Sequence, residues 1–130
     1  MLDLDHLAEV MGIRVIESPD LRADLNALYV HHRRRVIIRH DLDPYTRRAA
    51  LAHELGHAYY GDDQADDPRL ERRADQWAAR LLITPESYAH AEHLHGPHEG
   101  AIAWELGVTP DLVRVWRGLH SRTPERTHAV

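Results

Sequence analysis

The sequence contains no cysteine, no lysine and no phenylalanine, and it has no long apolar run. Without cysteine, the chain has no disulfide, no thiolate metal ligand and no cysteine nucleophile. No stretch approaches the roughly 18 apolar residues that a membrane-spanning helix needs. The N-terminus carries acidic residues where a secretory signal would begin with basic ones, so the expected location is the cytoplasm.

Net charge and histidine content are more informative than the missing residue types. The chain of 130 residues has a formal net charge of -5 with histidine neutral, which argues against nucleic-acid binding by bulk electrostatics. This length predicts one domain, with at most a small appendage. The 12 histidines exceed ordinary usage, and imidazole is the commonest metal ligand in proteins. The composition therefore directs attention to a metal site.

The first 40 residues predict a short helix and a small antiparallel sheet. Apolar side chains recur at helical spacing over residues 3–11, and a short strand is expected over 13–18. Apolar alternation over 25–32 and 36–40 predicts a hairpin around the arginine run 33–35. That run is interpreted as a solvated turn, with contact to an acidic substrate segment as the alternative.

The rest of the chain is predicted to be helical. Two strong helices are expected over residues 46–60 and 70–83, with an acidic loop between them. The histidine-rich stretch 88–100 contains a Gly-Pro pair that breaks it, and residues 102–119 predict two short helices around a Gly-Val-Thr turn. A small antiparallel sheet together with several helices corresponds to the α+β class.

Residues 53–57 read His-Glu-Leu-Gly-His inside the first of these strong helices. Four residues advance a helix by about 400°, so His53 and His57 stack on one face and can chelate one Zn²⁺. Glu54 lies about 100° around the helix, where a carboxylate can hold a metal-bound water without being a ligand itself. A water that attacks a carbonyl needs such a base.

Two acidic residues on the next predicted helix extend this pattern. Glu71 follows His57 by fourteen residues, and Glu71 and Asp75 are spaced i, i+4 on one helix face. Glu71 can complete a His₂Glu set with a fourth position open for water, and Asp75 can hold a ligand imidazole by its other ring nitrogen. The alternative is a helix with two histidines that bind no metal.

Two segments of this region, ALAHELGHAYYGD and ERRADQWAARLLITPE, resemble the ImmA/IrrE family of metallopeptidases. The family pattern is HExxH, then a Glu-x-x-Ala-Asn/Asp helix that continues into an aromatic residue, an Ala and LLMP. Here the aromatic residue is Trp77, and Leu-Leu-Ile-Thr-Pro stands in place of LLMP. The resemblance spans residues 25–86.

The resemblance implies a zincin-like fold in which His53, His57 and Glu71 bind zinc and Glu54 is the catalytic base. It also implies a protein substrate, a helix-turn-helix repressor or regulator that is cleaved to release gene expression. Such proteins often act in phages, other mobile elements or stress responses.

Several other polar residues have no spacing that assigns them a role. A donor near the developing oxyanion is needed, and the candidates are Tyr59, Tyr60, Tyr88, His40 and His90. A second histidine cluster could bind another metal, but the Gly-Pro pair interrupts it and no carboxylate pattern accompanies it; it comprises His90, His93, His95 and His98. Structural or exposed positions are expected for both groups.

Residues 99–118 fit a helix-turn-helix template. Ala103 is the small residue of the first helix, Gly107 makes the turn, Val108 lies beneath it, and Val113 and Trp116 face inward. Basic and acidic residues are balanced near this segment, so DNA binding is not expected; they are Arg114, Arg117, Arg122 and Arg126 against Glu99, Glu105, Asp111 and Glu125. A structural or substrate-docking role is favoured.

The sequence thus predicts a metallopeptidase core over residues 1–88 and a C-terminal helical extension over 89–130, packed on that core. The favoured function is a zinc endopeptidase that makes a limited cut in a regulatory protein. The alternative is a non-proteolytic antirepressor or transcriptional regulator that uses the metal site structurally. The oligomeric state is not determined by the sequence.

Overall fold

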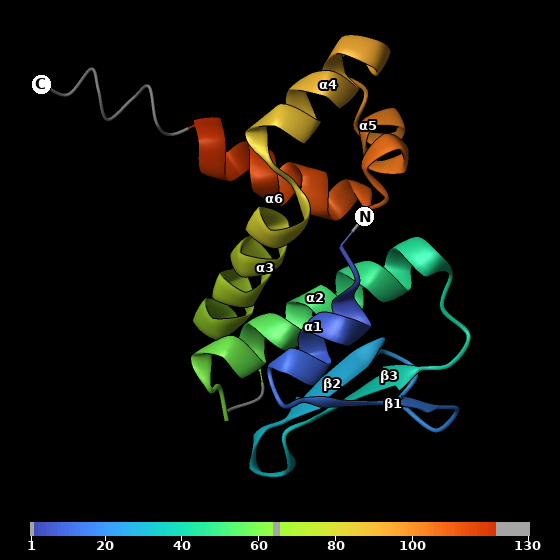
Figure 1. Cartoon of the computed structure of the whole chain (residues 1–130), viewed down its shortest axis with the longest axis vertical. Helices are drawn as coiled ribbons and strands as arrows, with labels where there is room; N and C mark the ends of the chain where they lie inside the picture. The colour runs from blue at the N-terminus through green and yellow to red at the C-terminus, as the bar shows by residue number, and fades with distance from the viewer. Residues whose placement is uncertain (1, 64–65, 122–130) are drawn as a thin grey trace, which may run out of the picture.

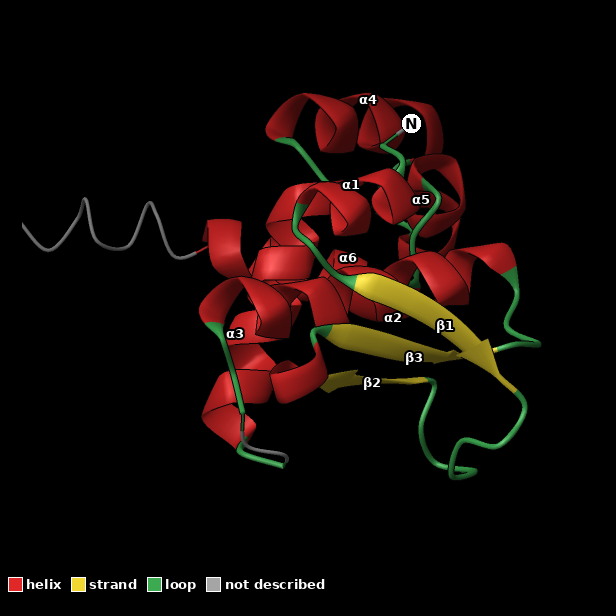
Figure 2. Ribbon diagram, turned by 60° about the horizontal axis from the view of Figure 1, so that its bottom comes forward, coloured by secondary structure: helices red, strands yellow, loops and turns green. Residues whose placement is uncertain are grey.

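The computed structural model describes residues 2–63 and 66–121 of the chain. The N-terminal part contains one helix, three strands and one turn of 3₁₀ helix. In chain order these are α1 (Leu4–Val10), β1 (Arg14–Ser18), β2 (Ala27–Val30), η1 (His31–Arg33) and β3 (Arg35–Arg39). Five further helices follow, namely α2 (Pro44–Tyr60), α3 (Pro68–Leu82), α4 (Pro85–His95), α5 (Glu99–Leu106) and α6 (Pro110–Ser121). The helices gather on one side of the small sheet, and the fold is α+β and zincin-like, as predicted (Figures 1 and 2).

The sheet has the order β1-β3-β2 and is mixed, which corrects the expectation of an antiparallel sheet. The predicted hairpin is confirmed, because β2 and β3 pair antiparallel with Tyr29 opposite Val36. β1, however, pairs parallel to β3, with Val15 opposite Val36. β3 takes the central position because Val36 and Ile38 are fully buried, whereas β1 and β2 each keep one edge unpaired among the described residues.

Helix α2 is the longest helix and has well-defined ends. Asp43 caps its N-terminus by accepting hydrogen bonds from the backbone N–H groups of Tyr45 and Thr46, and Pro44 occupies the first turn. Gly61 ends the helix in the left-handed conformation, at φ 68° and ψ 33°. These ends orient α2 across the sheet, where it contacts β2 and β3 and, on its other side, α3.

A glycine allows α2 and α3 to approach closely. A Cβ added at Gly56 would lie 3.1 Å from the carbonyl oxygen of Ala74 and 3.3 Å from the ring of Trp77. Any side chain at position 56 would therefore push α3 away from α2. The glycine inside the His-Glu-Leu-Gly-His motif thus sets the spacing of the two helices that carry the predicted metal ligands.

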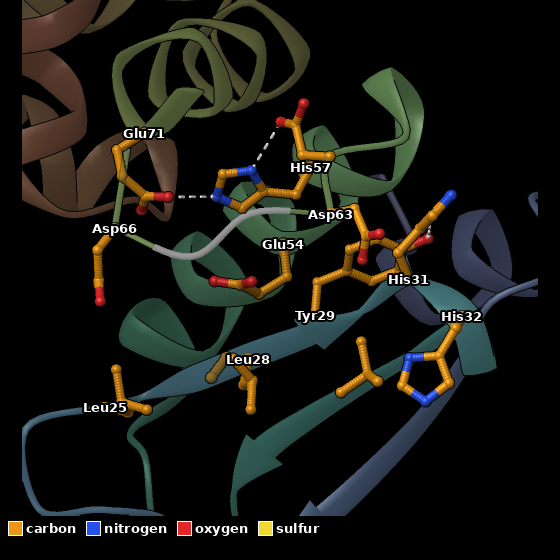
Figure 3. A pocket seen from close by; sticks show the side chains of 13 residues that line it. Leu25, Leu28, Tyr29, His31, His32, Glu54, His57, Asp63, Asp66 and Glu71 are labelled. Carbon is orange, nitrogen blue, oxygen red and sulfur yellow. Dashed lines mark hydrogen bonds and ion pairs between the residues drawn. The ribbon is translucent and has the colours of Figure 1, made fainter. Parts of the chain in front are cut away.

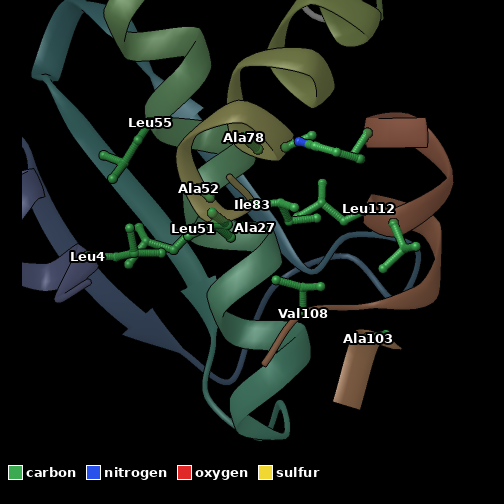
Figure 4. Close-up of a cluster of buried hydrophobic side chains, with 14 of the residues drawn as sticks. Leu4, Ala27, Leu51, Ala52, Leu55, Ala78, Ile83, Ala103, Val108 and Leu112 are labelled. Carbon is green, nitrogen blue, oxygen red and sulfur yellow. The ribbon is translucent and has the colours of Figure 1, made fainter. Parts of the chain in front are cut away.

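The hydrophobic core continues from the sheet into the C-terminal helices. Leu51 and Leu55 of α2 are fully buried (Figure 4). Ile102 of α5 and Val113 of α6 are fully buried as well. Helix α6 packs against α3, so the C-terminal segment shares the core with the N-terminal part. Within the part of the chain that the structure describes, no helix is long and apolar enough to cross a membrane.

Candidate metal centre

The three predicted metal ligands meet between α2 and α3. His53 and His57 lie one turn apart on α2, with ring centroids 4.8 Å apart and edge-to-face. Glu71, in the first turn of α3, reaches both rings: its two carboxylate oxygens lie 3.0 Å from His53 Nε2 and 2.8 Å from His57 Nε2. Figure 3 shows the Glu71 carboxylate directed at the ring of His57.

The donor atoms of this group fit a single metal ion. One ligand atom from each of His53, His57 and Glu71 lies within 4.8 Å of the others. Two imidazole nitrogens and one carboxylate oxygen form the set that a mononuclear site uses when a fourth position is left for water or substrate. This chemistry is that of a transition-metal site, because Mg²⁺ and Ca²⁺ prefer all-oxygen ligands.

Each histidine is oriented by a second carboxylate behind it. His53 Nδ1 lies 2.7 Å from Asp75 Oδ1, and His57 Nδ1 lies 2.9 Å from Asp62 Oδ2. With Nδ1–H donating to a carboxylate, a neutral imidazole presents the lone pair of Nε2 toward the shared metal position. Asp75 therefore lies where the sequence predicted it, whereas the matching role of Asp62 was not predicted.

Asp62 is buried and is itself held in place by an arginine of α3. Its side chain is 6% exposed, and Arg73 of α3 donates to its second oxygen over 2.6 Å. The Arg73 guanidinium also stacks on the ring of Tyr60 at 3.9 Å from the centroid. The signal in the sequence was the Gly61-Asp62 pair: the left-handed glycine turns the chain back, and the backbone N–H of Asp62 donates to the carbonyl of His57.

The same environment shifts two pKa values. Burial alone would lower the pKa of His53, but the hydrogen bond to Asp75 and the nearby charge of Glu54 raise it to about 9. Burial raises the pKa of Glu54, which is 9% exposed, and the two histidines oppose that shift. The surrounding carboxylates therefore stabilise a positive charge beside His53, either a second ring proton or a metal ion in its place, and burial favours proton uptake at Glu54.

Glu54 points into a cavity of about 300 Å³ between α2 and strand β2 (Figure 3). This cavity, here called the metal cavity, contains Glu54, His57 and Glu71 on one side. The other side is formed by the end of the preceding loop, β2 and η1, from Leu25 to His32. Edge strand β2 is therefore the wall that faces Glu54.

None of the predicted oxyanion donors lines this cavity. Tyr59 packs near Trp77, Tyr60 lies under Arg73, and Tyr88 stacks on Trp116. His40 and His90 are exposed on other elements. The polar rings that line the cavity are Tyr29, His31 and His32, and Tyr29 Oη lies 2.8 Å from His31 Nδ1. No local pattern in the sequence indicates them, because their position depends on how β2 docks on α2.

The second histidine cluster does not converge on a point. His90, His93 and His98 are exposed, and His95 instead pairs with Glu105 at 2.8 Å. Among residues 2–63 and 66–121, the only group of three or more potential ligands is His53, His57 and Glu71.

The helix-turn-helix-like shape of the C-terminal segment is confirmed. Gly107 is left-handed, and the predicted inward positions are buried, namely Ala103, Val108, Val113 and Trp116. Arg114 pairs with Glu99 and Asp111, and Arg117 donates to the Tyr88 hydroxyl and the Pro97 carbonyl. Of the charges weighed in the sequence, Arg122, Glu125 and Arg126 lie outside the described residues.

A helix with two histidines and a glutamate between them, completed by a glutamate from the next helix, defines the metallopeptidase class of site. Comparison with known protein families identifies the metallopeptidase family to which the chain belongs. The Peptidase_M78 family model, described as an IrrE N-terminal-like domain, matches residues 8–115, so the chain belongs to this family of metallopeptidases. A search of curated proteins finds no match. The match extends past residue 88, and the proposed boundary between core and extension stays a prediction.

Proposed function

We propose that this protein is a zinc-dependent endopeptidase that makes a limited cut in a regulatory protein. The observation that carries the proposal is the convergence of His53, His57 and Glu71 within 4.8 Å, with the buried Glu54 beside them. A site with only a structural metal has its coordination closed by four protein ligands, whereas three ligands beside a cavity leave a position for water or substrate. Membership in a metallopeptidase family supports the same conclusion.

The residues of the site divide the chemistry between them. When bound by His53, His57 and Glu71, Zn²⁺ supplies a Lewis acid that polarises the scissile carbonyl and acidifies water. Glu54 then accepts a proton from the attacking water and delivers it to the nitrogen of the leaving amine. Burial raises its pKa, which makes the Glu54 carboxylate a stronger proton acceptor than an exposed glutamate.

Strand β2 supports the binding of an extended peptide. It pairs with β3 on one side, and its other edge is unpaired among the described residues. A substrate segment that adds to this edge gains main-chain hydrogen bonds and passes in front of Glu54. An extended conformation also presents one peptide bond at a time to the metal position.

The proposed substrate is a repressor of the helix-turn-helix type, as the resemblance to the ImmA/IrrE family implies. Selectivity then depends on binding energy from parts of the substrate remote from the scissile bond. We expect unfolded casein to be cut slowly, if at all, and the cognate repressor at one or two sites. Efficient casein degradation at many sites, blocked by a zinc chelator, would contradict a partner-specific enzyme.

The second candidate is a non-proteolytic antirepressor or regulator, favoured by the helix-turn-helix-like segment α5–α6. A Glu54→Gln variant separates the two functions, because it removes the base and keeps the three metal ligands. The variant should bind zinc and remain folded but lose cleavage and the biological effect, whereas Glu9→Gln, an exposed change on α1, should keep both. A Glu54→Gln protein that keeps its biological effect would support the regulator.

A further inference from the structure

A second cavity adjoins the metal centre on its other side. It has a volume of about 480 Å³ and is bounded by α2, the loop before β2, Asp75 of α3 and the N-terminal part of α6. We call it the α6 cavity, because α6 supplies one whole wall; from the C-terminal segment it is lined by Thr109, Asp111, Leu112 and Val115.

The α6 cavity shares part of its lining with the metal cavity. Glu54, Leu25 and Ala27 line both. His57 lies on the metal-cavity side of Glu54, and His53 lies on the α6-cavity side. A peptide that follows the edge of β2 in front of Glu54 therefore has one cavity on each side of the bond to be cut.

Part of the wall of the α6 cavity is apolar, and the cavity leaves room for a large side chain. On α2, the face that leads away from His53 carries only Thr46, Ala49 and Ala50 along this cavity, and their short side chains form its floor. Leu112 and Val115 of α6 face that floor. A substrate side chain with a long aliphatic stem can bury its methylene groups there.

The rim of the same cavity is negatively charged. Asp24 lies before β2 and Asp111 lies in the first turn of α6, with side chains 65% and 85% exposed. Among the residues that the structure describes, no arginine lines the cavity. Arg22 and Arg114 pair with these carboxylates from outside, but exposed ion pairs contribute little free energy and are readily exchanged for another cation.

We propose that the α6 cavity is a side-chain subsite that accepts an arginine or lysine of the substrate next to the scissile bond. The inference rests on the proposed peptidase function, and it adds a specificity that the metal site does not contain. The aliphatic stem of the substrate side chain lies between the α2 floor and the α6 wall, and its cationic end reaches Asp24 and Asp111.

This subsite also assigns a role to the helix-turn-helix-like segment. The first turn of a recognition helix normally approaches DNA. Here the first turns of α6 line a cavity shared with Glu54, and Asp111 adds a charge that repels phosphate and attracts a basic side chain. The segment thus contributes to substrate selection within the peptidase.

The test measures binding, so that it does not depend on turnover. The full-length, zinc-loaded chain is titrated calorimetrically with acetohydroxamate and with three dipeptide hydroxamates that carry arginine, leucine or glutamate beside the metal-binding group. We expect the arginine compound to bind about tenfold more tightly than the glutamate compound, since two exposed carboxylates attract one and repel the other.

Two kinds of variant test whether the preference for the arginine compound arises in the α6 cavity. Asp24→Asn and Asp111→Asn should each weaken the arginine compound about threefold and leave the leucine compound unchanged. Asp63→Asn removes an equal charge from the metal cavity and should leave the ratio unchanged. Ala49→Leu, which keeps a strong helix former, should fill the α6 cavity and weaken both the leucine and the arginine compounds, while acetohydroxamate binds as before.

Equal affinity for the arginine and glutamate compounds, or a preference that survives both Asp→Asn changes, would overturn the subsite. A chain that keeps the arginine preference but cleaves no protein would overturn the peptidase function and leave the subsite standing. Cleavage of protein without any preference for the arginine compound would overturn the subsite and leave the peptidase function standing. Failure to bind even acetohydroxamate would contradict both proposals.

Discussion

Helices α2 and α3 carry the metal centre, and the C-terminal helices α4–α6 carry a similar supply of histidine, arginine and acidic residues without forming one. On α2, two histidines one turn apart face a glutamate from α3, and each has a carboxylate behind it. On α4, His90 and His93 point to solvent, and His95 forms a pair with Glu105. The difference shows that histidine content alone does not make a metal site. A carboxylate from a second element must reach two histidines at once, as Glu71 reaches His53 and His57.

The largest expected effect comes from removing a ligand of the metal centre. His53→Ala, His57→Ala or Glu71→Gln should each lower zinc affinity by more than about 100-fold, beyond what the loss of an orienting carboxylate causes. His90→Ala and His93→Ala, on exposed positions of α4, should leave the metal content at about one Zn²⁺ per chain. Metal analysis of the purified proteins measures the zinc content of the ligand variants and of the α4 variants.

Full zinc occupancy in a His53→Ala/His57→Ala double variant would show that these two histidines do not bind the metal, and would assign the metal site to α4. Loss of zinc from the His90→Ala or His93→Ala variant would likewise assign the metal site to α4.

The next effect concerns the two carboxylates behind the histidines. Asp62→Ala and Asp75→Ala should each weaken zinc binding by about 10- to 100-fold. Asp62 should be nearer the upper limit, because it is buried and its loss also leaves Arg73 without its carboxylate partner, whereas Asp75 is half-exposed. Competition with a chelator measures the affinities.

Asp63→Ala is the matched control for Asp62, since it removes the neighbouring, exposed carboxylate. A larger loss with Asp75→Ala than with Asp62→Ala would show that burial does not determine which orienting contact matters more.

A smaller effect should come from Gly56, which sets the distance between α2 and α3. A methyl group at this position must displace the backbone of Ala74, so Gly56→Ala should reduce the free energy of unfolding by about 1–3 kcal/mol. It should also weaken zinc binding, because α3 moves Glu71 away from the histidines. Thermal unfolding in the presence and absence of a chelator separates the two contributions.

Gly118 on α6 is the control in the other region. An added Cβ there meets nothing within 4 Å, so Gly118→Ala should stabilise the helix by up to about 1 kcal/mol. Equal effects at both glycines would mean that the close approach of α2 and α3 is not required.

The smallest expected effect is on DNA binding by the C-terminal helices. Arg114 and Arg117 are engaged with Glu99, Tyr88 and Pro97, so few charges are available to displace counterions from a duplex. A gel-shift assay with promoter DNA from the host locus at physiological salt should show no tight complex. Sequence-selective binding that disappears on Arg114→Ala or Arg117→Ala would favour the regulator over the peptidase.

Most of the local structure could be predicted because short-range rules determine it. The helical period puts His53 and His57 on one face, and capping residues such as Asp43 and Gly61 define where α2 begins and ends. The turn at Gly107 and the burial of Val108 follow from the same kind of local pattern. These features depend on residues a few positions apart, which a sequence displays directly.

The placement of β3 was not predictable from such rules. Alternation predicts a strand but not its neighbours, and the central position went to the strand whose two inward side chains, Val36 and Ile38, are fully buried. The chain returns through β2 before it enters the centre, so β1 and β3 run parallel.

The sequence by itself determined the two histidines, the base between them and the glutamate that could complete a metal site. Tertiary structure decided that Asp62 orients His57, that β2 faces Glu54, and that α6 lines a second cavity beside it. The reason is physical: ligand spacing within a helix is fixed by its hydrogen bonds, whereas contacts between distant segments depend on how closely the elements pack. At the metal centre that packing depends on the missing side chain of Gly56.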